Sequence, residues 1–204
     1  MNDEQSPASD THVTGRVPAG LTTAEFVLRP IVAGDAANDH AALMETRDEL
    51  RLWEQSSWPE DDFTVEANRD DLAGLEARHN DRRALTYTVL DPAGGECLGC
   101  VYVFPTGASF LEKATVTPVG DDAWAEVDLV VYFWVRRSRM ATAMDERLLA
   151  ALRAWFADEW DAEKVVFVVS ELFAQQVELI RRTDLALQFE LVEPQKPGRF
   201  LVFG

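Results

Sequence analysis

The chain has 204 residues, of which 47% are hydrophobic, and it carries a formal net charge of −17. This length suits one globular domain with a sizeable core. The charge excludes the basic surface that nucleic acid and anionic lipid need, and it favours cationic substrates or partners, although solubility alone would also explain it. No apolar run approaches the roughly 20 residues of a membrane helix, so no membrane span is expected. Together with the negative charge, this means that neither nucleic acid nor a membrane is an expected partner.

The N-terminal segment is polar and lacks the apolar stretch of a secretory signal. We expect residues 1–24 to form a disordered tail and residues 25–204 to form a single domain. Cys97 and Cys100 are too few for a disulfide framework, so the sequence predicts a cytoplasmic protein. Their C-x-x-C spacing has no partner Cys or His pair, and we interpret both as packing residues. The three histidines are dispersed, so no metal site is expected.

The N-terminal half alternates short apolar runs with helical patterns. We predict a strand at 26–31, a helix at 35–55, a helix from Thr64 to about Asn80, and strands at 85–90 and 97–104. Thr64 is the expected N-cap of its helix. The turn sequence Asp91-Pro-Ala-Gly-Gly95 joins the last two strands as a hairpin. Residues 106–123 hold turn residues and are expected to form an irregular loop.

The C-terminal half contains a strand–helix–strand unit. We predict a strand at 125–135, a helix at 139–160, a buried strand at 164–169, a helix at 172–182, and strands at 187–192 and 200–203. The complete order is β-α-α-β-β-β-α-β-α-β-β. Such an order indicates an α/β (α+β) fold with a mixed central sheet and helices on both faces.

One local stretch carries a family resemblance. Trp134-Val-Arg-Arg-Ser138 is followed by Arg139-Met-Ala-Thr-Ala-Met144 and by the pair Leu148-Leu149. With the element order over residues 26–203, this resembles the GNAT superfamily of acyl-CoA N-acyltransferases. The resemblance implies acetyl-CoA as co-substrate and no metal. It implies a CoA pyrophosphate on backbone amides at the helix start and a pantetheine arm along the strand end. The expected cofactor-binding residues are Phe133, Trp134, Val135, Arg136, Arg139, Met140, Ala141 and Thr142.

The resemblance implies transfer of an acetyl group to an amine of a small molecule or peptide. Two positions depart from the family. The first glycine of the family motif Arg/Gln-x-x-Gly-x-Gly/Ala is Arg139, in a turn shortened by about four residues, so the side chain could block the cradle or contact a phosphate. Ile180 stands where the family has a tyrosine acid and cannot donate a proton. The alternative is a catalytically degenerate domain that serves as a binding or regulatory module.

Glu126 and Asp128 are the candidate catalytic residues. The two residues are two positions apart on the predicted strand, so their side chains would share one face. A carboxylate beside aromatic rings is desolvated, which raises its pKa and suits it to act as a base. The alternative is the solvated end of a half-exposed strand. Trp53, Trp58 and Phe63 form an aromatic cluster with nearby carboxylates at the joint of the first two helices. This cluster would suit the binding of a cationic amine. The alternative is that the three rings belong to the packed core. A homodimer is a possible assembly.

Overall fold

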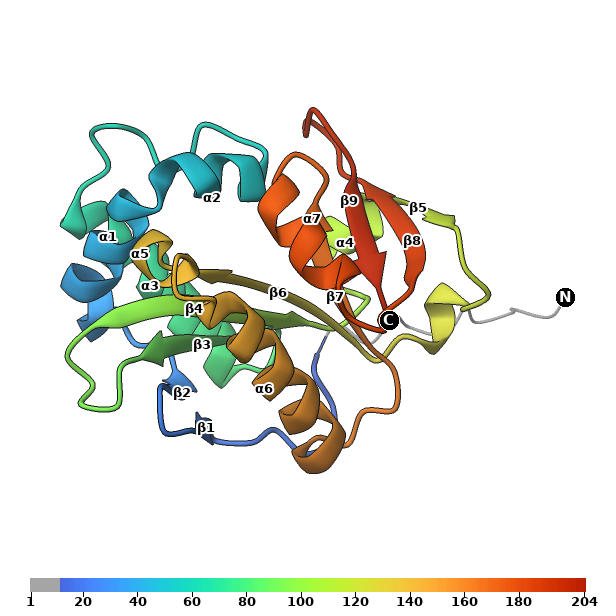
Figure 1. Cartoon of the computed structure of the whole chain (residues 1–204), viewed down its shortest axis with the longest axis horizontal. Coiled ribbons are helices and arrows are strands. Elements are labelled where there is room, and N and C mark those ends of the chain that lie inside the picture. The colour runs from blue at the N-terminus through green and yellow to red at the C-terminus, as the bar shows by residue number, and fades with distance from the viewer. Residues whose placement is uncertain (1–11) are drawn as a thin grey trace, which may run out of the picture.

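The computed structural model describes residues 12–204, which build one nine-stranded mixed sheet (Figure 1). The strands lie in the order β1-β2-β3-β4-β6-β7-β9-β8-β5. Their bounds are β1 Leu21–Thr22, β2 Val27–Pro30, β3 Leu85–Leu90, β4 Cys97–Phe104, β5 Thr115–Pro118, β6 Leu129–Val135, β7 Val165–Ser170, β8 Leu187–Val192 and β9 Phe200–Phe203. Only β6 and β7 pair in parallel; the other neighbours are antiparallel.

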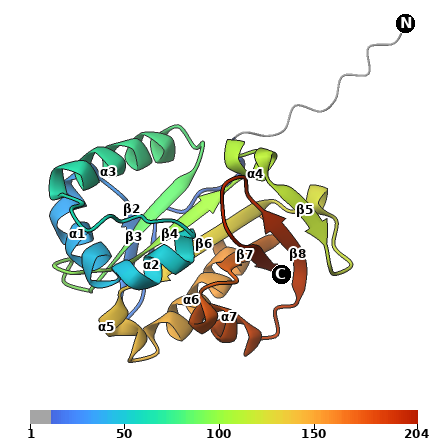
Figure 2. The same ribbon diagram turned by 90° about the horizontal axis from the view of Figure 1, so that it is seen from above.

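Helices cover both faces of this sheet (Figure 2). Their bounds are α1 Ala36–Glu45, α2 Arg47–Glu54, α3 Val65–Asn80, α4 Ser109–Lys113, α5 Arg137–Met140, α6 Met144–Glu159 and α7 Ala174–Arg181, with short 3-10 turns at Ala33–Asp35 and Trp124–Glu126. One buried cluster joins the sheet to α6 and α7, and a second joins its other face to α1, α2 and α3. Within residues 12–204, no helix is long and apolar enough to cross a membrane.

Strongly patterned segments fold as the sequence predicts. The strands β3, β4, β8 and β9 have the expected bounds. α3 begins as expected after Thr64, whose side-chain hydroxyl accepts a hydrogen bond from the Ala67 amide at 3.1 Å. β6, α6 and β7 form the expected parallel unit, so the predicted mixed sheet with helices on both faces is confirmed.

Three predicted elements were wrong in their bounds. The helix expected at 35–55 is broken at Thr46, where φ is −101° and ψ is 9°. The helix expected at 139–160 is α5 and α6, separated by a turn. The strand expected at 125–135 begins only at Leu129, because residues 124–126 form a 3-10 turn.

The expected loop and tail are partly ordered. The segment 106–123 contains α4 and β5, and β5 pairs with the distant strand β8. Residues 12–24, expected in the tail, lie against the domain: Val13 is buried and β1 pairs with β2. The hydroxyl of Tyr87 also donates to the Pro18 carbonyl at 2.9 Å. The remainder of the predicted tail, residues 1–11, lies outside the described residues.

Candidate functional site

The parallel strands β6 and β7 separate before β6 ends. They pair only at Leu129 with Val165, Val130 with Val166, and Val131 with Phe167. The rest of β6, residues 132–135, keeps its pairing with β4 but has no strand partner on the β7 side. The predicted residues Phe133, Trp134 and Val135 therefore lie along an open strand edge, which we call the slot.

Two side chains from distant elements reach the backbone at the slot. The Phe133 carbonyl oxygen accepts from Trp53 Nε1 at 2.9 Å and from Gln176 Nε2 at 2.8 Å. Trp53 is on α2 and Gln176 is on α7, so both helices are anchored at this strand edge. The sequence placed Trp53 at a helix joint, but nothing local identified this carbonyl as its partner. Trp58 and Phe63 pack on each other, with ring centroids 6.0 Å apart.

The turn before α6 differs from the expected one. Helix α6 begins at Met144, and the preceding Ala143 has φ 57°, the left-handed region that glycine favours. Helix α6 therefore begins five residues beyond Arg139, and the position with the glycine-like φ is four residues beyond it. Arg139, expected at the first glycine, lies within α5, whereas the left-handed position of the turn is held by Ala143.

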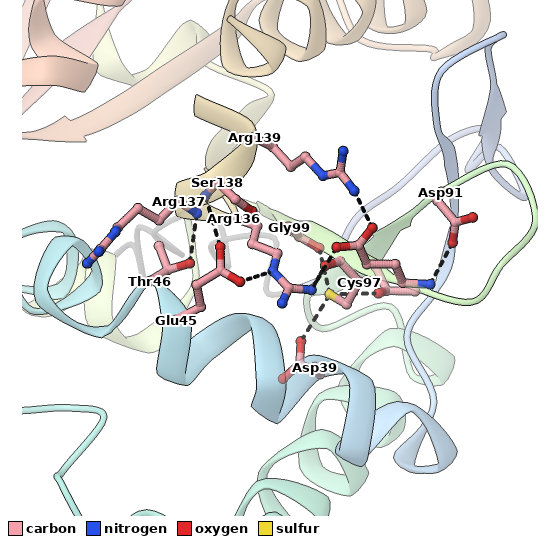
Figure 3. A network of polar contacts seen from close by, with 12 residues as sticks. Asp39, Glu45, Thr46, Asp91, Cys97, Gly99, Arg136, Arg137, Ser138 and Arg139 are labelled. Atoms are coloured by element: carbon pink, nitrogen blue, oxygen red, sulfur yellow. Dashed lines mark hydrogen bonds and ion pairs between the residues drawn. The ribbon is translucent and has the colours of Figure 1, made fainter. Parts of the chain in front are cut away.

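Arg136 and Arg139 point toward acidic partners (Figure 3). Arg136 Nε lies 2.6 Å from Glu45 Oε2, and its Nη1 lies 3.0 Å from Glu96 Oε1. The Arg139 guanidinium pairs with the other oxygen of Glu96. These ion pairs join α5 to the end of α1 and to the β3–β4 hairpin. Both arginines thus have partners within the fold.

The backbone at the start of α5 is also occupied. The Ser138 amide donates to Glu45 Oε1 at 2.9 Å, and the Arg137 amide donates to Thr46 Oγ1 at 3.0 Å (Figure 3). Desolvation alone would raise the pKa of Glu45, but the hydrogen bonds from Ser138 and Arg136 outweigh it and lower that pKa to about 2. A carboxylate and a hydroxyl of this chain therefore already accept hydrogen bonds from these two amides.

A cavity of about 420 Å³ lies between the start of α6 and α7. The first-turn amides of α6 have no intrahelical acceptor, so this wall carries partial positive charge. Its lining also includes three acidic side chains and one basic side chain; in full it comprises Met140, Ala143, Asp145, Glu146, Ala174, Gln175, Glu178, Leu179 and Arg182. The helix start attracts an anion here, and the carboxylates oppose it. Of the predicted cofactor residues, only Met140 lines this cavity, whereas Ala141 and Thr142 lie in the preceding turn.

The predicted catalytic carboxylates lie before β6, at the end opposite the slot. Glu126 is in a 3-10 turn and its Oε2 lies 3.1 Å from Lys164 Nζ. Asp128 Oδ2 accepts from the amides of Glu163 at 2.8 Å and Lys164 at 2.9 Å. Asp128 therefore closes a turn. The two carboxylates do not share a strand face as expected, because both residues precede β6.

A different carboxylate lies near the slot. Burial raises the pKa of Glu193, an effect that Lys196 opposes and Glu54 assists. Lys196 Nζ pairs with Glu54, which ties the β8–β9 connection to the end of α2. Burial raises the pKa of the Tyr132 hydroxyl in β6, and the negative charges of Glu193 and Glu54 raise it further. Sequence reasoning missed Glu193 because its neighbours come from separate parts of the chain.

The remaining candidate groups have structural partners. Ile180 is fully buried in the core beside α6. The indole nitrogen of Trp134, one of the predicted cofactor-binding residues, donates a hydrogen bond to Tyr102 Oη at 3.3 Å. Cys97 and Cys100 are buried free thiols, which confirms their interpretation as packing residues. Among residues 12–204, no group of three His, Cys, Asp or Glu side chains could hold a metal ion.

Comparison with solved structures identifies the fold. No protein-family model matches the chain, and no curated protein matches it significantly. The ribosomal-protein-S5-alanine acetyltransferase of Vibrio fischeri aligns with a TM-score of 0.64 at 14% identity, covering 91% of this chain and 95% of that one. Mycobacterium smegmatis RimJ, in complex with CoA-disulfide, aligns with a TM-score of 0.64 at 17% identity over 93% and 83%.

Two further solved structures are similar to the chain. The microcin C7 self-immunity acetyltransferase MccE, in complex with acetyl-CoA and AMP, has a TM-score of 0.64 at 12% identity over 95% of this chain and 98% of its own. A Bordetella pertussis protein described as of the GNAT family aligns at 15% identity with a TM-score of 0.59, covering 91% and 98%. The chain therefore has the acyltransferase fold of the GNAT superfamily.

Proposed function

We propose that this chain is an N-acetyltransferase that binds acetyl-CoA in the slot and transfers the acetyl group to an amine. The observation that carries the proposal is the separation of β6 from β7 after Val131, beside the cavity at the start of α6. An extended pantetheine arm can add to a free strand edge through main-chain hydrogen bonds. The start of α6 then faces the pyrophosphate, with Arg182 as the one basic side chain of the cavity.

The acceptor amine must lose a proton before or during attack on the thioester carbonyl. Glu193 is the carboxylate best suited to take it, because it is half-buried and its pKa is raised. Glu126 and Asp128 are less suited, since one pairs with Lys164 and the other caps a turn. The net charge of −17 favours a cationic acceptor. Several similar structures are described as acetylating ribosomal proteins, which supports a peptide amine over a neutral small molecule.

Calorimetric titration with acetyl-CoA tests this proposal. We expect saturable binding that weakens as salt is raised, because the cofactor is anionic. The variant Ala174→Trp places a bulky ring in the cavity from an exposed position and should abolish binding without unfolding the protein. Absence of heat at high micromolar acetyl-CoA in the parent protein would overturn the proposal.

A second function is favoured by two observations. The Phe133 carbonyl already accepts two side-chain donors, and three carboxylates line the cavity where a pyrophosphate would lie. Both would suit a domain that has lost acetyl-CoA binding and acts as a binding or regulatory module. A folded protein that binds neither acetyl-CoA nor CoA would favour this module over the enzyme.

A further inference from the structure

Two buried polar atoms beside the slot have no hydrogen-bond partner. They are the hydroxyl of Tyr132 and Oε1 of Gln176. The two residues are only 7% and 3% exposed, so both atoms are shielded from bulk solvent. An unpaired buried polar group costs stability, and native proteins keep few of them. Two such atoms around one strand edge indicate a ligand that would pair with them.

Tyr132 is the first residue of β6 beyond its last pair with β7. Its ring contacts Trp53 of α2 at a centroid distance of 6.2 Å and Phe200 of β9 at 6.3 Å. In the sheet, β7 lies between β6 and β9, the strand of Phe200. The Tyr132 ring on β6 therefore reaches Phe200 by extending across the place where β6 and β7 separate. The hydroxyl therefore lies at the closed end of the slot, among aromatic rings.

Gln176 approaches the same edge from α7. Its Nε2 donates to the Phe133 carbonyl, which fixes the side-chain amide and leaves Oε1 as a free acceptor. One donor hydroxyl and one acceptor oxygen thus border the unpaired part of β6. An acyl-pantetheine arm offers the complementary groups, namely amide N–H donors and a thioester carbonyl at its tip.

We propose that Gln176 Oε1 accepts a hydrogen bond from the pantetheine arm and that the Tyr132 hydroxyl donates one to the thioester carbonyl oxygen. The proposal rests on the proposed function, and it assigns the recognition of the acyl group to Tyr132. As the amine nitrogen bonds to the carbonyl carbon, negative charge grows on that oxygen and the hydrogen bond strengthens. The nitrogen's proton leaves to a base, and the C–S bond then breaks with its electron pair on sulfur. The hydroxyl keeps its proton throughout, consistent with burial that raises the pKa of Tyr132 well above its ordinary value.

The test compares the binding of acetyl-CoA and CoA by calorimetry, so no acceptor is needed. A hydrogen bond to the thioester should make the parent protein bind acetyl-CoA about fivefold more tightly than CoA. In Tyr132→Phe this preference should disappear while CoA affinity stays unchanged. Gln176→Met should weaken both ligands to the same extent, because its contact is with the arm they share.

Thr86→Val is the matched control. Thr86 also carries a buried hydroxyl without a partner, on β3, away from the slot. Removing it should leave the preference for acetyl-CoA intact. Tyr132→Phe should also raise the Tm of the ligand-free protein, because it removes a buried hydroxyl that has no partner. If the hydroxyl had a structural role instead, its removal would lower the Tm. If the parent protein binds CoA and acetyl-CoA equally, the role of Tyr132 is overturned and the proposed function survives. If it binds neither, the proposed function fails and this inference with it.

Discussion

Arg136 and Glu45 form an ion pair in which Nε lies 2.6 Å from Oε2, and the second carboxylate oxygen of Glu45 accepts the Ser138 amide. One carboxylate thus fixes a side chain and a backbone amide of the turn that leads to α6. The arginine side chain is 17% exposed, so solvent screens the pair only in part. The pair therefore stabilises the fold and positions the candidate site at once.

Glu45→Gln should destabilise the protein at neutral pH by about 1 to 2 kcal/mol, because two charge-assisted hydrogen bonds weaken. The pKa of Glu45 is lowered from 4.5 to about 2, so the carboxylate contributes stability above pH 4.5 and loses it as the pH falls toward 2. Denaturant unfolding of parent and variant from pH 7 to pH 2.5 should show the difference shrinking. Glu163→Gln, an exposed position, is the control. A difference that is constant with pH would contradict the assignment.

Asp39 should give the opposite dependence. Burial raises its pKa from 3.8 to about 6, against the hydrogen bonds from Asn68 and Cys97, with Asp35 raising it further and His40 lowering it. The folded state then holds a proton that the unfolded state has lost, so stability falls as the pH rises from about 4 to about 6.

Raising the pKa of Asp39 from 3.8 to about 6 corresponds to a loss of about 3 kcal/mol of folding stability by pH 7. Asp39→Asn should remove this part of the pH dependence in unfolding curves at pH 4.5 and pH 7.5. An unchanged dependence in the variant would show that another group is responsible.

Ala143→Gly should stabilise the protein by up to about 1 kcal/mol, because glycine adopts a positive φ without steric cost. Ala141→Gly is the matched control. Ala141 lies in the same turn with φ −60°, which alanine adopts without steric cost. Glycine at this position would only increase the conformational entropy of the unfolded chain, so Ala141→Gly should destabilise the protein. Equal changes in Tm for the two variants would be inconsistent with the left-handed conformation at Ala143.

Glu178→Gln should tighten acetyl-CoA binding severalfold at low salt, since it removes one of three carboxylates from the cavity. The gain should shrink at physiological salt, where exposed charges are screened within about 8 Å. Glu163→Gln removes an equal charge outside the cavity and should change affinity little. Calorimetry at two salt concentrations measures both variants.

Glu193→Gln and Glu126→Gln decide which carboxylate is the base. If Glu193 accepts the proton, its amide variant should lower turnover about 100-fold and remove the rise of rate with pH on the acid side. Glu126→Gln should then keep the pH profile of the parent protein. The reverse result would restore the role predicted for Glu126 from sequence.

Periodicity predicted the elements whose signal is local. β3 and β4 are apolar runs around a proline-glycine turn, and Thr64 is a strong helix cap. The breaks at Thr46 and Ala143 carry neither glycine nor proline, so tertiary contacts rather than propensity create them. β5 was missed because its partner, β8, is about 75 residues away in the chain, and such pairing leaves no local pattern.

The site was only partly predictable for the same reason. The sequence located the open strand edge at Phe133 to Val135 through a short motif. The side chains that complete it, Trp53 and Gln176, lie 80 and 43 residues from Phe133. Glu126 and Asp128 were chosen by strand alternation, which does not apply where the chain has not yet entered the strand.

Three residue pairs join β6 to β7, fewer than any other pairing in the described sheet except that of the short edge strand β1 with β2. On one side lie β1, β2, β3, β4 and β6, and on the other lie β7, β9, β8 and β5. Local opening is easiest where few hydrogen bonds cross, so this seam is where the two half-sheets can hinge. A molecule wedged in the slot would bridge the halves and damp that motion. Amide hydrogen exchange at Leu129 to Val131 should therefore slow when the slot is filled, even though no ligand touches those amides.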